Sequence, residues 1–146
     1  MRLLPEVLAP FQPQIAPSYD DVVVTIDKSK LLQVARMLKE DNRVSFDLLR
    51  LLTVVDYKDR FEVVYHLWSL SKKHRMVLKV NTSADEASVP SLFSVWRTVD
   101  WYEREARDLY GVNFEGHPNL TPLLLWEGFE GYPGRKSYPM PEYKEY

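Results

Sequence analysis

The sequence contains no cysteine. That absence excludes disulfide bonds, thiolate catalysis, iron–sulfur ligation by cysteine and the usual structural zinc sites. No run of about eighteen apolar residues occurs, so no segment is expected to cross a membrane as a helix. The first residues, MRLLPEVLAPF, are interrupted by Pro5 and Glu6 and therefore make a poor secretory signal.

Glycine is scarce and unevenly placed. All 5 glycines lie at or beyond position 111. Gly128, Gly131 and Gly134 are regularly spaced, but no strand–turn–helix unit surrounds them, so they do not form a phosphate-binding loop. What remains is the composition of one globular domain: 146 residues, 45% hydrophobic and 27% charged. The net charge of -2 gives no reason to expect a nucleic-acid partner.

The spacing of apolar residues predicts an α+β fold. Residues 21–26, DVVVTI, are rich in β-branched side chains, as expected of a short strand. Asp27 is suited to cap the helix that follows, in which Leu31, Val34 and Leu38 share one face. Further strands are expected at residues 44–57, 61–70 and 75–81, and a short helix is expected from Pro90 to Trp96.

We expect three parts along the chain: a proline-rich leader at 1–20, an α+β domain at 21–111 and an extended interaction arm at 112–146. The arm is rich in glycine and proline, which is typical of a segment without regular structure. Its aromatic residues are costly to leave in water and are common at protein interfaces. The arm is therefore expected to be ordered against another protein. Packing over its own domain and a floppy tail on a binding module are the alternatives.

The most distinctive stretch is WYEREARDLYGVNFEGHP at 101–118. Asp100 and Glu103 match a D-x-x-E capping box, and Gly111 is placed to end the helix. A helix is therefore expected over about 101–110. The residues expected to face the sheet are Tyr102, Ala106 and Leu109.

The charges of this helix predict an outward polar face. Glu103 stands four residues before Arg107, and Arg104 stands four residues before Asp108, so both pairs are expected to form ion pairs along the helix. Exposed pairs of this kind contribute only about 0.3–0.5 kcal/mol each, too little to explain so many charges. Glu105 has no cation on the same face within one turn. A partner chain could supply one, or Arg104 and Arg107 could reach outward to carboxylates of that partner.

The same charges could also be catalytic groups. A stand-alone enzyme would use Glu105, Asp108 and His117, but general acid–base work needs groups that face a shared cavity. Each carboxylate here has a neighbouring cation or is free to point into water. A metal site would need histidines at helical or hairpin spacing, whereas His66, His74 and His117 are far apart in the sequence. We therefore expect no catalytic residue and no metal ligand in this chain.

Two longer runs carry a resemblance to a known family. W-x-E-R-E-A-x-D-L-Y-G-V-x-F-E-G-H-P-N-L, followed by G-F-E-G-Y-P-G-R-K-S-Y-P, closely resembles the C subunit of the proton-pumping NADH:quinone oxidoreductase, respiratory complex I. The family is also called the 30 kDa subunit, and the J subunit in cyanobacteria and chloroplasts. The likeness continues upstream through LLTVVDY and VVYHLWSL, so it covers nearly all of the chain after the leader.

The resemblance implies a small mixed or antiparallel sheet with helices packed on one face, followed by an extended irregular arm. It implies no cofactor in this chain, because partner subunits of the complex bind NADH, FMN, the iron–sulfur clusters and quinone. The implied partners are the hydrogenase-large-like quinone-site subunit and the subunit with the terminal iron–sulfur cluster. The implied location is peripheral, on the cytoplasmic side of the cell membrane, in an enzyme that couples electron transfer to proton pumping.

The family signature and the arm together give the expected subunit interface. Its residues are Trp101, Glu103, Arg104, Glu105, Asp108, Phe114, His117, Pro118, Trp126, Phe129, Tyr132, Arg135 and Lys136. The sequence departs from the family at Thr121 and Pro122, where members usually carry one or two arginines. That departure leaves two other enzymes open: an energy-converting membrane-bound hydrogenase, or an oxidoreductase fed by ferredoxin or coenzyme F420.

Overall fold

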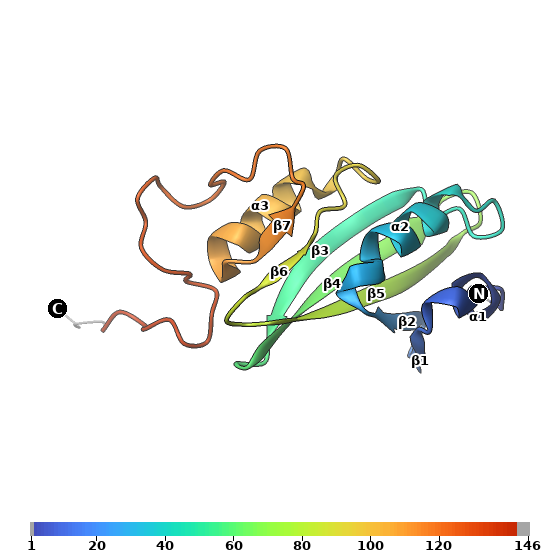
Figure 1. The fold of residues 1–146 in the computed structure, drawn as a ribbon, viewed down its shortest axis with the longest axis horizontal. Helices are drawn as coiled ribbons and strands as arrows, with labels where there is room; N and C mark the ends of the chain where they lie inside the picture. Colours follow the sequence, from blue (N-terminus) through green and yellow to red (C-terminus); the bar gives the residue numbers. More distant parts are fainter. Residues whose placement is uncertain (1, 143–146) are drawn as a thin grey trace.

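The computed structural model describes residues 2–142 (Figure 1). Its helices are α1 (Leu4–Leu8), α2 (Leu31–Glu40) and α3 (Val99–Tyr110), with short 3-10 turns at Ala9–Phe11 and Lys28–Lys30. Its strands are β1 (Gln14–Ser18), β2 (Asp21–Ile26), β3 (Leu48–Asp56), β4 (Arg60–Ser69), β5 (His74–Ser83), β6 (Ser88–Pro90) and β7 (Asn113–Glu115).

Five of these strands form one mixed sheet in the order β1-β2-β5-β4-β3. The β2–β5 pair is parallel and the other three pairs are antiparallel. One row across the central strands joins Val24, Leu78, Tyr65 and Leu52, and all four side chains are buried. These alternating apolar side chains supply most of the burial that stabilises the fold.

In the part of the chain that the structure describes, helices cover one face of this sheet, as Figure 1 shows for α2 and α3. The apolar stripe of α2 is fully buried, which confirms the predicted face of Leu31, Val34 and Leu38. Among residues 2–142 no helix packs on the opposite sheet face, where the register places Val64 between Thr53 and Lys79. The predicted α+β class, with helices on one face of a mixed sheet, is confirmed.

The first twenty residues contribute to the packed structure. Leu4 and Leu8 of α1 have no exposed surface and belong to the hydrophobic core. Strand β1 pairs with β2 along its whole length and forms one edge of the sheet. The boundary that we place at residue 20 stays a proposal, but the leader and the sheet share one core in this structure.

The predicted helix from Pro90 to Trp96 was wrong. Residues 88–90 instead form strand β6, which pairs in parallel with β7 and has Val89 opposite Phe114. Both of these side chains are buried, and turns follow over residues 93–95. Burial of Val89 therefore overrides the helix-starting tendency of Pro90.

Beyond β7, residues 116–142 contain no helix or strand. This segment is called the arm below. It follows α3 in the sequence, bends around that helix and ends on the side of the molecule away from α1 (Figure 1). Residues 143–146 of the predicted interaction arm lie outside the described residues.

Candidate functional site

Helix α3 differs from the prediction at one end only. Gly111 ends the helix with a left-handed φ of 74°, and its N–H donates to the Arg107 carbonyl, as predicted. The predicted cap at Asp100 was wrong, because the helix begins at Val99 and no side chain caps it. Asp100 lies in the first helical turn, and its Oδ1 is 2.9 Å from His117 Nε2.

Glu103 lies at the centre of a buried polar cluster under α3. Its side chain has no exposed surface. Its carboxylate accepts hydrogen bonds from the Ser91 hydroxyl, at 2.6 Å, and from the Leu92 N–H, at 2.8 Å. Burial raises the pKa of Glu103 to about 7; these two hydrogen bonds oppose that rise, and the nearby Asp100 carboxylate adds to it. The cluster ties the chain after β6 to the first turns of the helix.

His117 completes this cluster from the start of the arm. Its side chain is fully buried, and its Nδ1 accepts a hydrogen bond from the Asn119 N–H at 3.0 Å. The ring proton of neutral His117 is therefore on Nε2, which lies 2.9 Å from Asp100 and 3.9 Å from Glu103. Nε2 and Asp100 are at ion-pair distance, yet they are not aligned for a hydrogen bond. His117 thus joins the turn after β7 to the N-terminal end of α3.

Asp108 anchors the arm to the C-terminal half of α3. Its buried Oδ2 accepts hydrogen bonds from the N–H groups of Leu123, Leu124 and Leu125, at 2.8, 2.7 and 3.2 Å. Hydrogen bonds to an ionised carboxylate are stronger than neutral ones, and three converge on a single oxygen here. Asp108 therefore fixes the backbone of three consecutive arm residues.

Arg104 holds the preceding residues of the arm. Its guanidinium donates to the carbonyl oxygens of Thr121, at 3.0 Å, and Pro122, at 2.8 Å. These are the two positions where the resemblance led us to expect one or two arginines. Thr121 and Pro122 take part in this contact through their backbone carbonyl groups, so the contact does not depend on a cationic side chain at either position.

The predicted ion pairs along α3 were wrong. Among residues 2–142, no ion pair joins Glu103 to Arg107 or Arg104 to Asp108. Glu103 faces inward and bonds to the chain after β6, while Arg104 and Asp108 bond to backbone groups of the arm. A carboxylate or backbone group that is removed from water without a hydrogen bond destabilises the fold, whereas two exposed charges gain little free energy by pairing.

Further contacts fix the distal part of the arm. The Gly134 N–H donates to the Leu109 carbonyl at 2.8 Å, and Arg135 Nε donates to the Tyr110 carbonyl at 2.7 Å. The Lys136 N–H donates to Asp56 at the end of β3, at 2.8 Å. Burial acts to raise the pKa of Asp56, but the backbone hydrogen bonds from Lys136 and Lys58, together with the charges of Lys136 and Arg135, lower it, so this anchor is ionised.

Aromatic contacts accompany these hydrogen bonds. Arg107 donates to the Tyr132 hydroxyl at 2.9 Å, and the Arg135 guanidinium lies 4.8 Å from the Tyr132 ring centre and 5.0 Å from that of Phe61. Phe129 lies between Trp126 and Tyr138, with ring centres 4.7 and 6.3 Å away. The described arm therefore packs over its own domain, which is the alternative that the sequence left open.

The outer face of α3 and the adjoining arm leave large apolar side chains in solvent. Trp101 is 67% exposed, Leu124 is 60% exposed and Trp126 is 71% exposed. Beside Trp101 lies a groove of about 600 Å³ between the start of α3 and the arm. The groove is lined by Arg97, Thr98, Asp100, Trp101, Tyr102, Glu105, Leu123 and Leu124. This surface is the strongest candidate for contact with another molecule.

The structure separates the sequence-predicted interface residues into two groups. Several lie inside the molecule: Glu103, Asp108, Phe114 and the side chain of His117 are buried. Others remain at least partly accessible: Trp101, Arg104, Glu105, Pro118, Trp126, Phe129, Tyr132, Arg135 and Lys136. The buried group can support a contact surface but cannot form one.

The residues of the enzyme alternative do not converge. Asp108 is bound by the arm backbone, His117 contacts Asp100 and Glu103, and Glu105 lines the outer groove. None of the five main hollows within residues 2–142 is lined by Glu105, Asp108 and His117 together. Residues 2–142 also contain no group of three or more acidic or histidine side chains placed to hold a metal ion. Nor does any helix there have both the length and the apolar character needed to cross a membrane.

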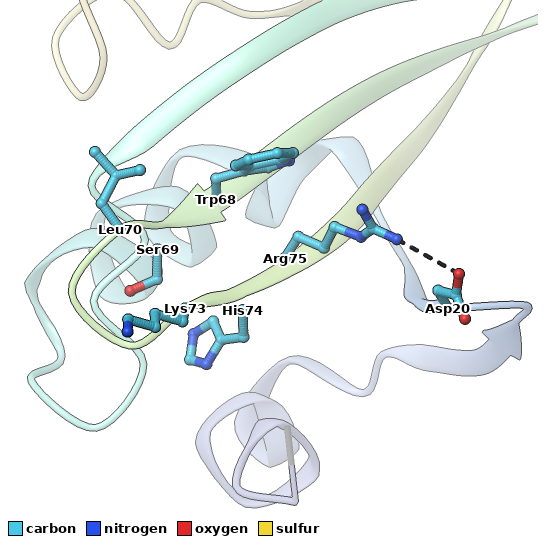
Figure 2. A pocket seen from close by; sticks show the side chains of 7 residues that line it. All are labelled: Asp20, Trp68, Ser69, Leu70, Lys73, His74 and Arg75. Carbon is cyan, nitrogen blue, oxygen red and sulfur yellow. Dashed lines mark ion pairs between the residues drawn. The ribbon is translucent and has the colours of Figure 1, made fainter.

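A second hollow, of about 540 Å³, lies at the turn between β4 and β5 (Figure 2). Its lining includes Trp68, Leu70 and Lys73, and Arg75 reaches across it to an ion pair with Asp20 at 3.8 Å. Leu70 is 62% exposed. The Arg75 charge is already used within the chain, since it also pairs with Asp21.

Sequence reasoning missed Ser91 and Asp56 as partners of the signature region. Ser91 carries no signal, because its role depends on the turn after β6 that brings it under Glu103. Asp56 has a local signal, since an aspartate that ends a strand commonly accepts a hydrogen bond two residues later, as it does from Lys58. That signal does not reveal its long-range bond to the Lys136 N–H.

Comparisons with known proteins agree with this architecture. A family model described as the respiratory-chain NADH dehydrogenase 30 kDa subunit matches residues 24–144. The C 2 subunit of the NADH-quinone oxidoreductase of Rhizobium meliloti (strain 1021) is 43% identical over 123 residues, which cover 82% of this chain and 67% of that protein. The C subunit of the same enzyme of Caulobacter sp. (strain K31) is 47% identical over 120 residues, covering 80% of this chain and 56% of that protein.

Two solved structures share the fold. A chain of the membrane-bound sulfane sulfur reductase, an archaeal respiratory membrane complex, aligns with a TM-score of 0.82 at 24% identity over 95% of this chain and 85% of that chain. The trypsin-resistant fragment of Nqo5 aligns with a TM-score of 0.67 at 25% identity, over 81% of this chain and 96% of that fragment. The family match and the identities of 43% and 47% to C subunits of NADH-quinone oxidoreductases confirm the resemblance. This chain belongs to the family of the 30 kDa subunit, or C subunit, of the respiratory-chain NADH dehydrogenase.

Proposed function

We propose that this chain is a structural subunit in the peripheral arm of a proton-translocating NADH:quinone oxidoreductase. It binds no cofactor itself; partner subunits bind NADH, FMN, the iron–sulfur clusters and quinone. It sits on the cytoplasmic side of the cell membrane and braces the quinone-site subunit and the subunit with the terminal iron–sulfur cluster. The observation that carries this proposal is the family match over residues 24–144.

The geometry of α3 and the arm supports a bracing role. Glu103 holds the chain after β6 against α3, and the buried His117 lies beside Asp100 at the start of the arm. Asp108 holds the backbone of arm residues 123–125 on α3. Trp101 and Trp126 are left exposed beside them. Large aromatic side chains held on a rigid support are the anchors that protein interfaces favour, because little conformational entropy is lost when they bind.

This arrangement divides the work of the signature residues. We propose that the buried residues Glu103, Asp108, Phe114 and His117 hold the surface in shape. The accessible residues then contact partner subunits: Trp101, Arg104, Glu105, Pro118, Trp126, Phe129, Tyr132, Arg135 and Lys136. Such a brace keeps neighbouring subunits in register, so that distances between their cofactors and the shape of their quinone pocket are preserved.

A second candidate is the equivalent subunit of an energy-converting membrane-bound hydrogenase or of a ferredoxin- or F420-dependent oxidoreductase. Thr121 and Pro122, in place of the arginines usual at these positions, favour a partner surface that differs from that of typical complex I. Their carbonyl oxygens accept hydrogen bonds from Arg104, so only the side chains of Thr121 and Pro122 are available to contact a different partner.

Purification of the tagged chain from its native membrane tests both candidates. Identification of the co-purifying proteins should yield the NADH-binding flavoprotein subunits together with the quinone-site and iron–sulfur subunits. A nickel-site large subunit in their place would favour the hydrogenase. Recovery of the chain with neither set would contradict the proposed function.

A further inference from the structure

One charged side chain in the 103–108 segment of α3 has no bonding partner among residues 2–142. Glu103, Arg104, Arg107 and Asp108 each bond to another part of the chain. Glu105 is exposed, and among residues 2–142 it forms no ion pair and no side-chain hydrogen bond. A solvated glutamate is ordinary on a helix surface, so Glu105 alone indicates nothing. Its surroundings are what single it out.

Glu105 and Trp101 stand one turn apart on the outer face of α3, and both line the 600 Å³ groove. Asp100 brings a second carboxylate to the same groove, with its side chain 36% exposed and its Oδ1 near His117. Arg97 is the one cation in the lining. The groove therefore combines an exposed indole with two carboxylates and carries a net negative charge.

The wall opposite α3 is also fixed in place. Leu123 and Leu124 line the groove, and their N–H groups are held by Asp108 at 2.8 and 2.7 Å. Leu124 nevertheless leaves 60% of its surface in solvent. The groove is thus held open by the same anchor that orders the arm, and a ligand would enter it without first having to order its walls.

We propose that this groove binds an arginine side chain of a partner subunit, presented on an otherwise apolar segment. A guanidinium stacks on the Trp101 indole and donates to the Glu105 and Asp100 carboxylates at the same time, while Leu124 packs against the apolar neighbours of the arginine. A planar guanidinium suits such a site better than an ammonium, because it is less strongly hydrated and stacks on aromatic rings. The proposal rests on the proposed function, and it assigns part of the subunit interface to this groove.

Photocrosslinking in the assembled complex identifies the occupant. The residue p-benzoylphenylalanine is placed at Trp101, and in a control at Thr53, an exposed position on the helix-free face of the sheet. Irradiation of the purified complex, followed by mass spectrometry, should join position 101 to a peptide of a partner subunit that carries arginine among apolar residues. An adduct with a second copy of this chain or with lipid, or no adduct at position 101, would overturn the proposal.

Charge substitution tests the chemistry of the site. Glu105→Lys should lower the amount of chain retained in the complex at 0.3 M salt at least ~10-fold, and Glu105→Gln by a smaller factor, because an arginine then meets a like or neutral group. Glu40→Lys makes the same charge change on α2 and should leave retention unchanged. Replacing the crosslinked arginine of the partner by glutamate should restore retention of Glu105→Lys.

The outcomes separate this inference from the proposed function. If the wild-type chain co-purifies with the oxidoreductase and Glu105→Lys is retained equally well, the groove does not bind a cation and the inference fails alone. If the wild-type chain does not co-purify with the oxidoreductase, the proposed function fails. Circular dichroism of Glu105→Lys should match the wild type, because the exposed Glu105 side chain forms no hydrogen bond or ion pair in the described chain.

Discussion

The five-stranded sheet and the arm are ordered by different means. The sheet is held by many alternating apolar side chains, of which Leu78 and Tyr65 at its centre have no exposed surface. The arm has no regular structure over residues 116–142 and is held at a few polar points, chiefly on α3. The stabilising contacts are therefore spread over the whole sheet. In the arm they are concentrated at a few residues, so that one anchor such as Asp108 positions several residues.

The difference has a functional meaning under the proposed bracing role. A sheet core tolerates small changes by repacking, whereas an arm held by single polar groups loses its shape when one of them is removed. The substitutions below should accordingly affect the whole domain when they fall in the sheet and only the arm when they fall on its anchors.

Leu78→Ala should give the largest loss of stability. Leu78 lies on the core face of β5, fully buried between β2 and β4. Removing its side chain leaves a cavity and should lower the free energy of global unfolding by about 2–5 kcal/mol. Urea denaturation of the isolated chain measures this. A loss confined to the arm would contradict the assignment of Leu78 to the shared core.

Glu103 should make stability depend on pH. Its pKa is raised from 4.5 to about 7 in the folded chain, so the folded state holds this proton more tightly than the unfolded state. The free energy of unfolding should therefore fall as pH rises from about 4.5 to about 7, by on the order of 3 kcal/mol, and this contribution should change no further at higher pH.

Glu103→Gln is the matched variant, because the amide keeps the shape of the carboxyl group and does not ionise. Denaturation from pH 4.5 to 8 should show a smaller decline in the variant than in the wild type. Equal slopes in the two proteins would show that Glu103 titrates as an ordinary exposed carboxyl group.

Asp108→Ala should free the arm and leave the sheet folded. The substitution removes an acceptor from three backbone N–H groups, and hydrogen bonds to charged groups contribute about 1.5–3 kcal/mol each. Limited trypsin digestion should cut this variant at Arg135 or Lys136 faster than the wild type. An unchanged rate of cleavage, at a trypsin concentration that leaves the rest of the domain intact, would show that the other anchors suffice to hold the arm.

Gly134→Ala should release a smaller part of the arm from α3. A Cβ at this position would lie 2.9 Å from the Leu109 carbonyl oxygen and 3.0 Å from the Leu109 and Tyr110 side chains. The Leu109 carbonyl belongs to α3 and cannot move aside, so the Gly134–Leu109 hydrogen bond should be lost at about 1–2 kcal/mol locally. Nuclear magnetic resonance shifts should change at residues 132–137 and at Phe61, which Arg135 contacts, and remain unchanged in β1 and β2.

Glu105→Gln should have the smallest effect on the isolated chain. No ion pair or side-chain hydrogen bond of Glu105 exists in the described residues, so the free energy of unfolding should change by less than about 0.5 kcal/mol. The effect on assembly described above is expected without this loss of stability. A large drop in the melting temperature of the free chain would mean that Glu105 stabilises the fold.

The sheet and α2 were predictable because their patterns are local. The alternation around Met76 and Leu78 and the stripe of Leu31 and Leu38 follow from strand and helix periods alone. The orientation of α3 was predicted less well. Glu103 is buried although it is charged, because Ser91 and the Leu92 N–H satisfy its carboxylate.

The anchors of the arm could not be predicted, for a physical reason. Asp108 and Asp56 bind backbone N–H groups, which every residue except proline carries, so the identity of Leu123 or Lys136 gives no signal. The signature predicted where the charges cluster but not which of them point inward. Glu105, for which the sequence offered no partner, kept its predicted outward position.

Hydrogen–deuterium exchange of the isolated chain tests the central claim most directly, namely that α3 orders the arm within this chain. The amides of Leu123, Leu124 and Gly134 should exchange slowly in the wild type, because each is hydrogen-bonded to α3. In Asp108→Ala the first two should exchange at the rate of an unstructured peptide, while the Leu78 amide in β5 remains protected. Exchange of the wild-type Leu123 and Leu124 amides at unstructured rates would contradict the account.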